Sequence, residues 1–110
     1  MEFQEPEQTG VCVYSKSNCK YCDMVKDLLT KRGFEYKVID CDEYIVEHKE
    51  YFKEFIDLHA SCDTAGFPKV FNNGSFIGSY NATKDFLDMI RFAPEDDAYI
   101  LHFNCGFYYN

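Results

Sequence analysis

Two periods of apolar residues predict alternating strands and helices in the first half of the chain. Residues 11–15 form the short apolar run of a buried strand, and residues 34–40 alternate like a second strand. Between them, apolar residues at helical spacing predict a helix over residues 21–30, with Gly33 as its C-terminal stop. An acidic amphipathic pattern then predicts a longer helix over residues 44–59.

A hairpin and a further helix are predicted to follow. Apolar residues 67–71 and 75–78 flank the Asn73-Gly74 pair, and Asn-Gly between apolar runs favours a hairpin turn. Asn81 is predicted to cap the last helix. The order β-α-β-α-β-β-α predicts an α/β fold, in which helices flank a mixed four-stranded sheet. Its first βαβ unit should be parallel with a right-handed crossover, and the hairpin should add antiparallel strands.

The two ends of the chain differ in pattern from the part between them. Residues 1–9 are acidic and are predicted to be a flexible N-terminus, and residues 10–92 are predicted to form one domain. In residues 93–110, Pro94 to Asp97 break the helix, and apolar side chains then fall on alternate positions from Tyr99 to Tyr109, as in a strand. We expect this C-terminal extension to be docked on the domain, because a free apolar strand would aggregate. Docking within one chain needs no second molecule, so a monomer is expected.

Composition and net charge indicate which cellular compartment and which classes of partner to expect. The net charge of −8 disfavours nucleic acid as a partner, and no apolar run approaches the ~20 residues of a membrane span. The N-terminal residues hold no apolar signal segment, so we expect a cytoplasmic protein. In such a reducing compartment, four cysteines outside the central motif are expected to be reduced, some of them buried. They are Cys12, Cys41, Cys62 and Cys105.

The motif Cys19-Lys20-Tyr21-Cys22 lies between the first predicted strand and the first predicted helix. Two thiols at this spacing can close a disulfide or hold a metal. A cysteine at a helix N-terminus ionises readily, because unpaired N–H groups there stabilise negative charge. Lys16 and Lys20 make the surroundings of Cys19 basic. This context favours a redox centre over a zinc half-site, and no metal is expected because no second ligand pair has suitable spacing.

Three segments resemble the glutaredoxin family of the dithiol C-x-Y-C type, and they occur in family order. They are residues 15–22, which hold a lysine three positions before the first cysteine, residues 66–68 and residues 77–82. The resemblance implies a thioredoxin-like fold and glutathione-dependent exchange with glutathione mixed disulfides and protein disulfides. It makes Cys19 the nucleophile and Cys22 the resolving thiol. The C-terminal extension is not covered by the resemblance.

The resemblance also implies how glutathione is held. Lys16 would meet the glycyl carboxylate, and the backbone at Phe67, before a cis Pro68, would pair with the cysteinyl unit. Backbone N–H groups near Asn81 and Ala82 would hold the γ-glutamyl carboxylate. The plainer alternatives are that Lys16 is solvated, that Pro68 ends a loop and that Asn81 only caps its helix. The full implied set is Lys16, Tyr21, Phe67, Pro68, Gly78, Asn81 and Ala82.

The chain departs from the family pattern at four positions. Ser79 replaces a glycine, Lys20 replaces the common proline, and Phe67 is bulkier than the usual valine or isoleucine. Ala82 stands where the family often has an aspartate, which would pair with the glutathione ammonium. Ala82→Asp is therefore expected to lower the Michaelis constant for glutathione substrates. These departures bear on affinity and substrate range, not on the class of reaction.

Other classes of protein fit the sequence less well than a glutaredoxin-like oxidoreductase. A thioredoxin would carry tryptophan before C-G-P-C, and a glutathione transferase would need a helical domain. An interaction domain without catalysis would not need both thiols and Lys16. The alternative kept open is a glutathione-ligated iron–sulfur cluster module, which a colourless purified protein would argue against. The expected partners are glutathione and disulfide-bonded or glutathionylated proteins, with ribonucleotide reductase as one family possibility.

Overall fold

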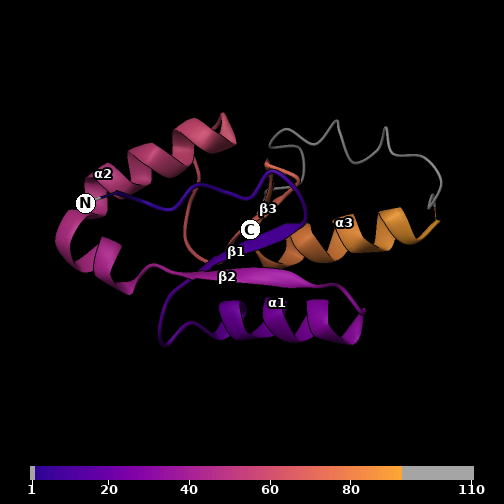
Figure 1. Ribbon diagram of the computed structural model, residues 1–110. Helices are drawn as coiled ribbons and strands as arrows, with labels where there is room; N and C mark the ends of the chain where they lie inside the picture. Colours follow the sequence, from indigo (N-terminus) through magenta and orange to yellow (C-terminus); the bar gives the residue numbers. More distant parts are fainter. Residues whose placement is uncertain (1, 93–110) are drawn as a thin grey trace.

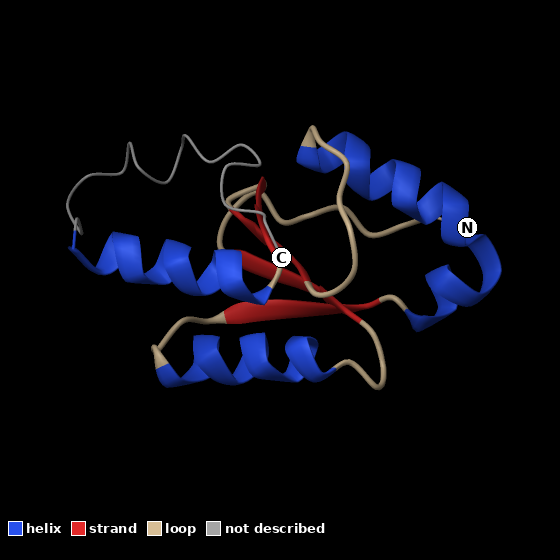
Figure 2. Cartoon of the chain, turned by 180° about the vertical axis from the view of Figure 1, so that it is seen from behind, coloured by secondary structure: helices blue, strands red, loops and turns tan. Residues whose placement is uncertain are grey.

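The computed structural model describes residues 2–92 of the chain, and there a four-stranded sheet is packed between helices (Figures 1 and 2). The observed order confirms the predicted β-α-β-α-β-β-α arrangement. In chain order the elements are β1 (Val11–Ser15), α1 (Lys20–Lys31), β2 (Tyr36–Asp40), α2 (Asp42–Ala60), β3 (Lys69–Asn72), β4 (Ser75–Gly78) and α3 (Tyr80–Phe92).

β1 is the strand around which the sheet is organised. The strand order is β2-β1-β3-β4, so β1 is hydrogen-bonded on both sides. It runs parallel to β2 and antiparallel to β3, with Val13 opposite Val38 on one side and Val70 on the other. All five residues of β1 are buried, as expected for a strand covered on both faces. The parallel first unit and the antiparallel hairpin confirm the predicted topology.

The alternation of side chains along β1 divides the core into two clusters. Val11 and Val13 face a cluster that α1 and α3 cover, whereas Cys12 and Tyr14 face a cluster that α2 covers. The first cluster is Val11, Val13, Val25, Leu29, Val70, Ile77, Ala82, Phe86 and Leu87. The second is Cys12, Tyr14, Ile39, Cys41, Phe52, Ile56, Ala60, Phe71 and Phe76.

The turn between β3 and β4 forms at the predicted Asn-Gly pair. Asn73 and Gly74 both have positive φ, 51° and 82°, which asparagine and glycine tolerate better than other residues. The Asn73 side chain also accepts a hydrogen bond from the Gly10 amide at 2.7 Å, and the Asn73 amide donates to the Gly10 carbonyl. The hairpin tip is therefore tied to the residue that precedes β1.

Several boundaries differ from the sequence prediction. β2 begins at Tyr36, two residues later than predicted, and α2 begins earlier, at Asp42, and bends at His48, whose φ is −143°. The prediction that Asn81 caps the last helix is wrong, because α3 begins at Tyr80 and Asn81 lies within its first turn. The Ser79 carbonyl instead accepts the Thr83 amide, as the residue before a helix does.

The N-terminal segment, predicted to be flexible over residues 1–9, makes several contacts with the domain. The Phe3 ring lies 5.0 Å from the ring of Tyr44 and 5.3 Å from that of Phe52, measured between centroids. The Tyr14 hydroxyl donates to the Gln4 carbonyl at 2.5 Å. Figure 1 shows this segment running alongside α2. Because the residues around Phe3 are mostly polar or acidic, the sequence pattern did not indicate that this half-buried ring packs against the domain.

The cysteines outside the CxxC motif differ in whether they are free thiols or disulfide-bonded. Cys12 and Cys41 are buried free thiols, as expected. Cys62 is disulfide-bonded, so the expectation that it is reduced is wrong. Cys105 and the docking predicted for residues 93–110 lie outside the described residues.

Residues 2–92 contain neither a membrane-spanning helix nor a cluster of metal-binding side chains. No helix in this part is long and apolar enough to cross a bilayer. Nor do three or more His, Cys, Asp or Glu side chains gather there as a metal-binding group.

We predict that Phe3→Ala lowers the free energy of unfolding by about 1–2 kcal/mol, because it removes a half-buried ring from an aromatic cluster. Thermal and urea unfolding measure this loss. Tyr51→Ala is the matched control, because Tyr51 is an exposed aromatic residue of α2, the helix that Phe3 contacts. Its loss should change the free energy of unfolding by no more than about 0.5 kcal/mol. Equal effects of the two substitutions would show that the N-terminal segment is not anchored by Phe3.

Candidate active site

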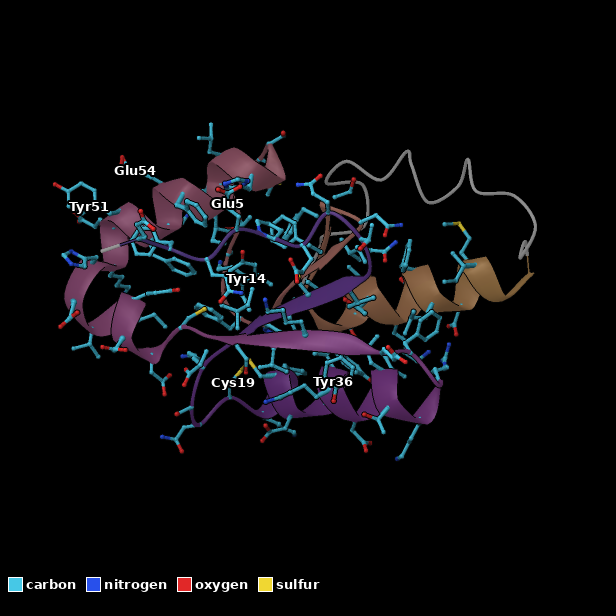
Figure 3. All side chains as sticks on the ribbon, viewed as in Figure 1. Glu5, Tyr14, Cys19, Tyr36, Tyr51 and Glu54 are labelled. Atoms are coloured by element: carbon cyan, nitrogen blue, oxygen red, sulfur yellow. A yellow bond between two sulfur atoms is a disulfide. The ribbon has the colours of Figure 1, made fainter. Side chains whose placement is uncertain are left out.

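Cys19 and Cys22 are joined by a disulfide at the N-terminal end of α1 (Figure 3). Cys19 is the residue that caps the helix, with extended backbone angles of φ −122° and ψ 103°, and its sulfur accepts a hydrogen bond from the Cys22 amide at 3.2 Å. Cys19 is partly exposed, whereas Cys22, one turn further along, is 0% exposed. An incoming molecule can therefore reach the first sulfur but not the second.

The local electrostatics favour a thiolate at Cys19 once the disulfide is reduced. The unpaired N–H groups of the first helical turn give this end of α1 a partial positive charge. The Cys22 amide already points at the Cys19 sulfur and would stabilise a negative charge on it. Cys22 is buried and lies deeper in the helix, so it lacks the same advantage.

The loop before β3 forms a wall of the site. The Phe67–Pro68 peptide bond is cis, which confirms the geometry that the resemblance implies, and Gly66 adopts a positive φ of 63°. Beside this loop lies a cavity of about 240 Å³, at the start of α3. It brings three predicted residues together, namely Tyr21, Phe67 and Asn81, and the Tyr21 and Tyr80 rings lie 6.2 Å apart across it. Its lining is Tyr21, Ala65, Gly66, Phe67, Ser79, Tyr80 and Asn81.

Three of the predicted site residues, Gly78, Pro68 and Ala82, are buried and do not line the cavity. Gly78 ends β4 in a buried position with a φ of +138°, a conformation that favours glycine, directly before Ser79 of the cavity. Pro68 is buried behind the loop. Ala82 is 0% exposed, and its side chain belongs to the core covered by α1 and α3. An aspartate there would bury a carboxylate, which argues against the expectation that Ala82→Asp improves substrate binding.

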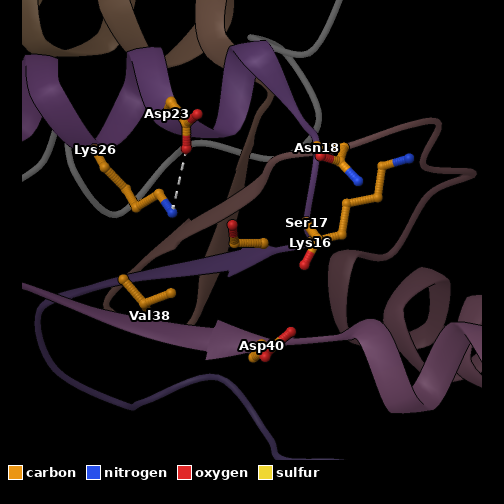
Figure 4. Close-up of a pocket in the computed structure, with 8 residues that line it drawn as sticks. Lys16, Ser17, Asn18, Asp23, Lys26, Val38 and Asp40 are labelled. Atoms are coloured by element: carbon orange, nitrogen blue, oxygen red, sulfur yellow. Dashed lines mark ion pairs between the residues drawn. The ribbon is translucent and has the colours of Figure 1, made fainter.

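Lys16 lies apart from that cavity and lines two others. One of these has a volume of about 260 Å³ and lies where the loop after β1 meets β2 (Figure 4). The amide and hydroxyl of Ser17 both donate to the Asp42 carboxylate, and these bonds hold the pKa of Asp42 below its ordinary value. The loop that carries Lys16 toward the redox pair is thus tied to the start of α2.

The second cavity lined by Lys16 has a volume of about 510 Å³ and lies between α2 and the Phe67 loop. The Lys16 ammonium is 5.9 Å from the centroid of the Phe67 ring. Sequence reasoning missed a further lining residue, Lys69, which is only 4% exposed. Its burial lowers the pKa of Lys69 to about 8, against the opposing attraction of Asp57. The only sequence signal was a lysine inside the apolar run after Pro68.

Comparison with known proteins assigns the family. The sequence profile of the glutaredoxin family matches residues 11–77. The chain is 36% identical over 74 residues to mitochondrial glutaredoxin-2 of Bos taurus, a match that covers 66% of this chain and 44% of that relative. The chain thus matches less than half the length of this curated relative. The mitochondrial glutaredoxin-2 proteins of Rattus norvegicus and Homo sapiens match over similar shares.

Solved structures agree with this assignment. The holo form of glutaredoxin C1 from Populus tremula x tremuloides superposes with a TM-score of 0.60 at 30% identity, covering 78% of this chain and 74% of that one. A buckwheat glutaredoxin–glutathione complex has the same fold, with a TM-score of 0.62 at 24% identity over 80% of this chain and 76% of the other.

These comparisons also correct one expectation. The names of the mammalian relatives point to mitochondria, so the expectation of a cytoplasmic protein is wrong. The match of the family profile to residues 11–77, over a thioredoxin-like fold with a Cys19–Cys22 disulfide at the start of α1, shows that the chain belongs to the glutaredoxin family.

Proposed function

We propose that the chain is a glutathione-dependent thiol–disulfide oxidoreductase that reduces glutathione mixed disulfides and protein disulfides. The observation that carries this proposal is the asymmetry of its cysteine pair. Cys19 is partly exposed at the positive end of α1, two residues before Tyr21 of the cavity at the Phe67 loop, whereas Cys22 is fully buried. One sulfur is thus positioned for attack on a substrate and the other for attack within the chain.

The reaction with a glutathione mixed disulfide needs only Cys19. Its thiolate attacks the glutathione sulfur, a Cys19–glutathione disulfide forms, and the substrate leaves as a thiolate that takes up a proton. The thiolate of a second glutathione then attacks the sulfur of the bound glutathione. Oxidised glutathione leaves and the Cys19 thiolate is restored. Overall, the mixed disulfide and one molecule of free glutathione become the substrate thiol and oxidised glutathione, one half of which comes from the substrate.

The reaction with a protein disulfide needs both cysteines. Cys19 attacks one substrate sulfur and forms a mixed disulfide, and the other substrate sulfur leaves as a thiol. Cys22 then attacks Cys19, which releases the second substrate thiol and leaves the Cys19–Cys22 disulfide seen in the structure. Two molecules of glutathione reduce that disulfide in turn.

A lowered pKa helps Cys19 mainly as a leaving group. A lowered pKa raises the fraction of thiolate at pH 7, but a Brønsted slope of about 0.5 removes a similar factor in nucleophilicity. Attack by Cys19 therefore gains little. Its departure gains more, because a stable thiolate is readily displaced when the second glutathione attacks.

Glutathione is proposed to lie along the Phe67 loop, from Lys16 to the start of α3. The Lys16 ammonium would bind the glycyl carboxylate, and the Phe67 backbone would pair with the cysteinyl unit beside Cys19. Backbone N–H groups of Asn81 and Ala82 in the first turn of α3 would bind the γ-glutamyl carboxylate. Support comes from the cavity that joins the Tyr21 ring, this loop and this helix start. The substrate class proposed with it is disulfide-bonded or glutathionylated proteins.

The first prediction from this mechanism concerns the two thiols. Cys19→Ser should abolish reduction of a glutathione mixed disulfide by glutathione, because no nucleophile remains at the start of α1. Cys22→Ser should retain substantial turnover of the same substrate but lose reduction of protein disulfides by the dithiol route. A coupled assay for oxidised glutathione measures the first reaction. Activity without Cys19, or equal losses in both variants, would contradict the assignment of roles.

The second prediction concerns the glutathione ammonium. Asn81 is exposed and lines the cavity of the Phe67 loop, so Asn81→Asp should place a carboxylate at this cavity, one residue before the position of the family aspartate. We expect a few-fold lower Michaelis constant, since an exposed charge pair contributes at most about 1 kcal/mol. Ala82→Asp is the contrasting variant and should lower the melting temperature instead, because it buries a charge. An unchanged Michaelis constant in a folded Asn81→Asp protein would show that the ammonium does not reach Asn81.

A further inference from the structure

The 510 Å³ cavity between α2 and the Phe67 loop concentrates positive charge in an acidic chain. The chain has eleven basic residues and a net charge of −8, yet four of its lysines line this one cavity, accompanied by a single acidic residue, Glu50. The cavity is defined by Lys16, Ile45, Lys49, Glu50, Phe52, Lys53, Gly66, Phe67 and Lys69, and is called the lysine cavity below.

Lys69 is the least exposed of the four lysines. Its ammonium donates to the Thr64 hydroxyl oxygen at 3.1 Å, and that hydroxyl in turn donates to Asp57. The Asp57 carboxylate is shared with Lys53, which it contacts at 2.6 Å. Among residues 2–92, Lys69 has no carboxylate within ion-pair distance. An ammonium carries three donors, so Lys69 retains capacity for an incoming acceptor.

Keeping a lysine in this position is unfavourable for the fold alone. Burial opposes the charged form of Lys69, and a methionine could fill the same space without a charge to desolvate. A group that lowers stability where it stands is commonly one that binds something. The wall of the cavity is also fixed, because the Phe67 ring stacks on Phe52, with the two planes 9° apart.

The lysine cavity is connected to the redox pair by the same ring. The Lys69 ammonium lies 4.9 Å from the centroid of the Phe67 ring and the Lys16 ammonium 5.9 Å from it. Lys16 is three residues before Cys19, and Phe67 also lines the cavity at the start of α3. A substrate whose disulfide meets Cys19 therefore has the lysine cavity within reach of its neighbouring residues.

We propose that the lysine cavity binds an acidic side chain of the protein substrate, with Lys69 and Lys49 as its carboxylate-binding residues, so that substrates with glutamate or aspartate near the reacting cysteine are preferred. This inference rests on the proposed function. Lys49 has no ion pair among the described residues, whereas Lys53 is already paired with Asp57 and Asp63. The proposed glutathione contacts use Lys16 and the start of α3, which leaves Lys69 and Lys49 for a second carboxylate.

Two matched peptides test the preference. Each carries one glutathionylated cysteine, flanked by glutamates in one peptide and by glutamines in the other. The ratio of kcat/KM for the acidic peptide to that for the neutral peptide is measured with excess glutathione. The wild-type ratio should be about ten, the effect of one charge-assisted hydrogen bond, and Lys69→Gln and Lys69→Met should both bring it to about one.

The controls separate this subsite from general charge effects. Lys31→Gln removes an exposed lysine that pairs with Asp27 at the far end of α1, and it should keep the wild-type ratio. Melting curves verify that the Lys69 variants fold, and Lys69→Met preserves the buried apolar stem. A wild-type ratio of one or less would overturn the inference. So would an equal loss with both peptides in the Lys69 variants, since the cavity would then serve glutathione itself or the fold.

A binding measurement keeps this inference distinct from the proposed function. Titration calorimetry of the two peptides into the Cys19→Ser variant compares their affinities without any chemistry. Tighter binding of the acidic peptide, lost when Lys69→Gln is added, supports the subsite even if turnover of both peptides is absent and the proposed function fails. Equal affinities of the two peptides would overturn the subsite while leaving the redox chemistry of Cys19 intact.

Discussion

The burial of β1 between two hydrogen-bonded partner strands is the constraint on which the rest of the structure depends. Because β1 pairs with β2 on one side and β3 on the other, its residues face a helix-covered core on both surfaces of the sheet. The end of β1 at Ser15 then fixes where the chain leaves the sheet, and four residues later Cys19 caps α1. The same pairing holds β3, and hence the cis Phe67–Pro68 bond before it, next to that helix end.

Burial also separates the reactive thiol from the inert ones. Desolvation raises the pKa of Cys41 to about 12 and raises that of Cys12 above its ordinary value, so both remain protonated thiols at neutral pH. Cys19 meets the opposite environment, because it is partly exposed at the start of α1, where N–H groups are unpaired and Lys16 and Lys20 lie close in the sequence. One small domain therefore carries thiols that differ in accessibility and in their electrostatic surroundings.

Sequence reasoning reached the features that local chemistry encodes. The Asn73-Gly74 turn, the strand before the CxxC motif and the helix after it each follow from short segments whose propensities agree with the fold. Sequence reasoning failed where contacts between distant segments determine which side chains are buried. Phe3 is a single aromatic residue in an acidic segment, and only contact with α2 buries it. The burial of Ala82 and Lys69 likewise depends on which faces the distant helices cover, which no local pattern states.

The start of α1 is expected to make Cys19 more readily ionised than Cys12, Cys22 or Cys41, and titration of these thiols tests this most directly. The reduced chain is alkylated with iodoacetamide over a range of pH, and mass spectrometry locates each modified cysteine. The account predicts that Cys19 reacts first, with a midpoint at least about two pH units below the ordinary cysteine value of about 8.5, while Cys12 and Cys41 stay unmodified until the chain unfolds. A midpoint for Cys19 near 8.5, or earlier modification of Cys22, would contradict it.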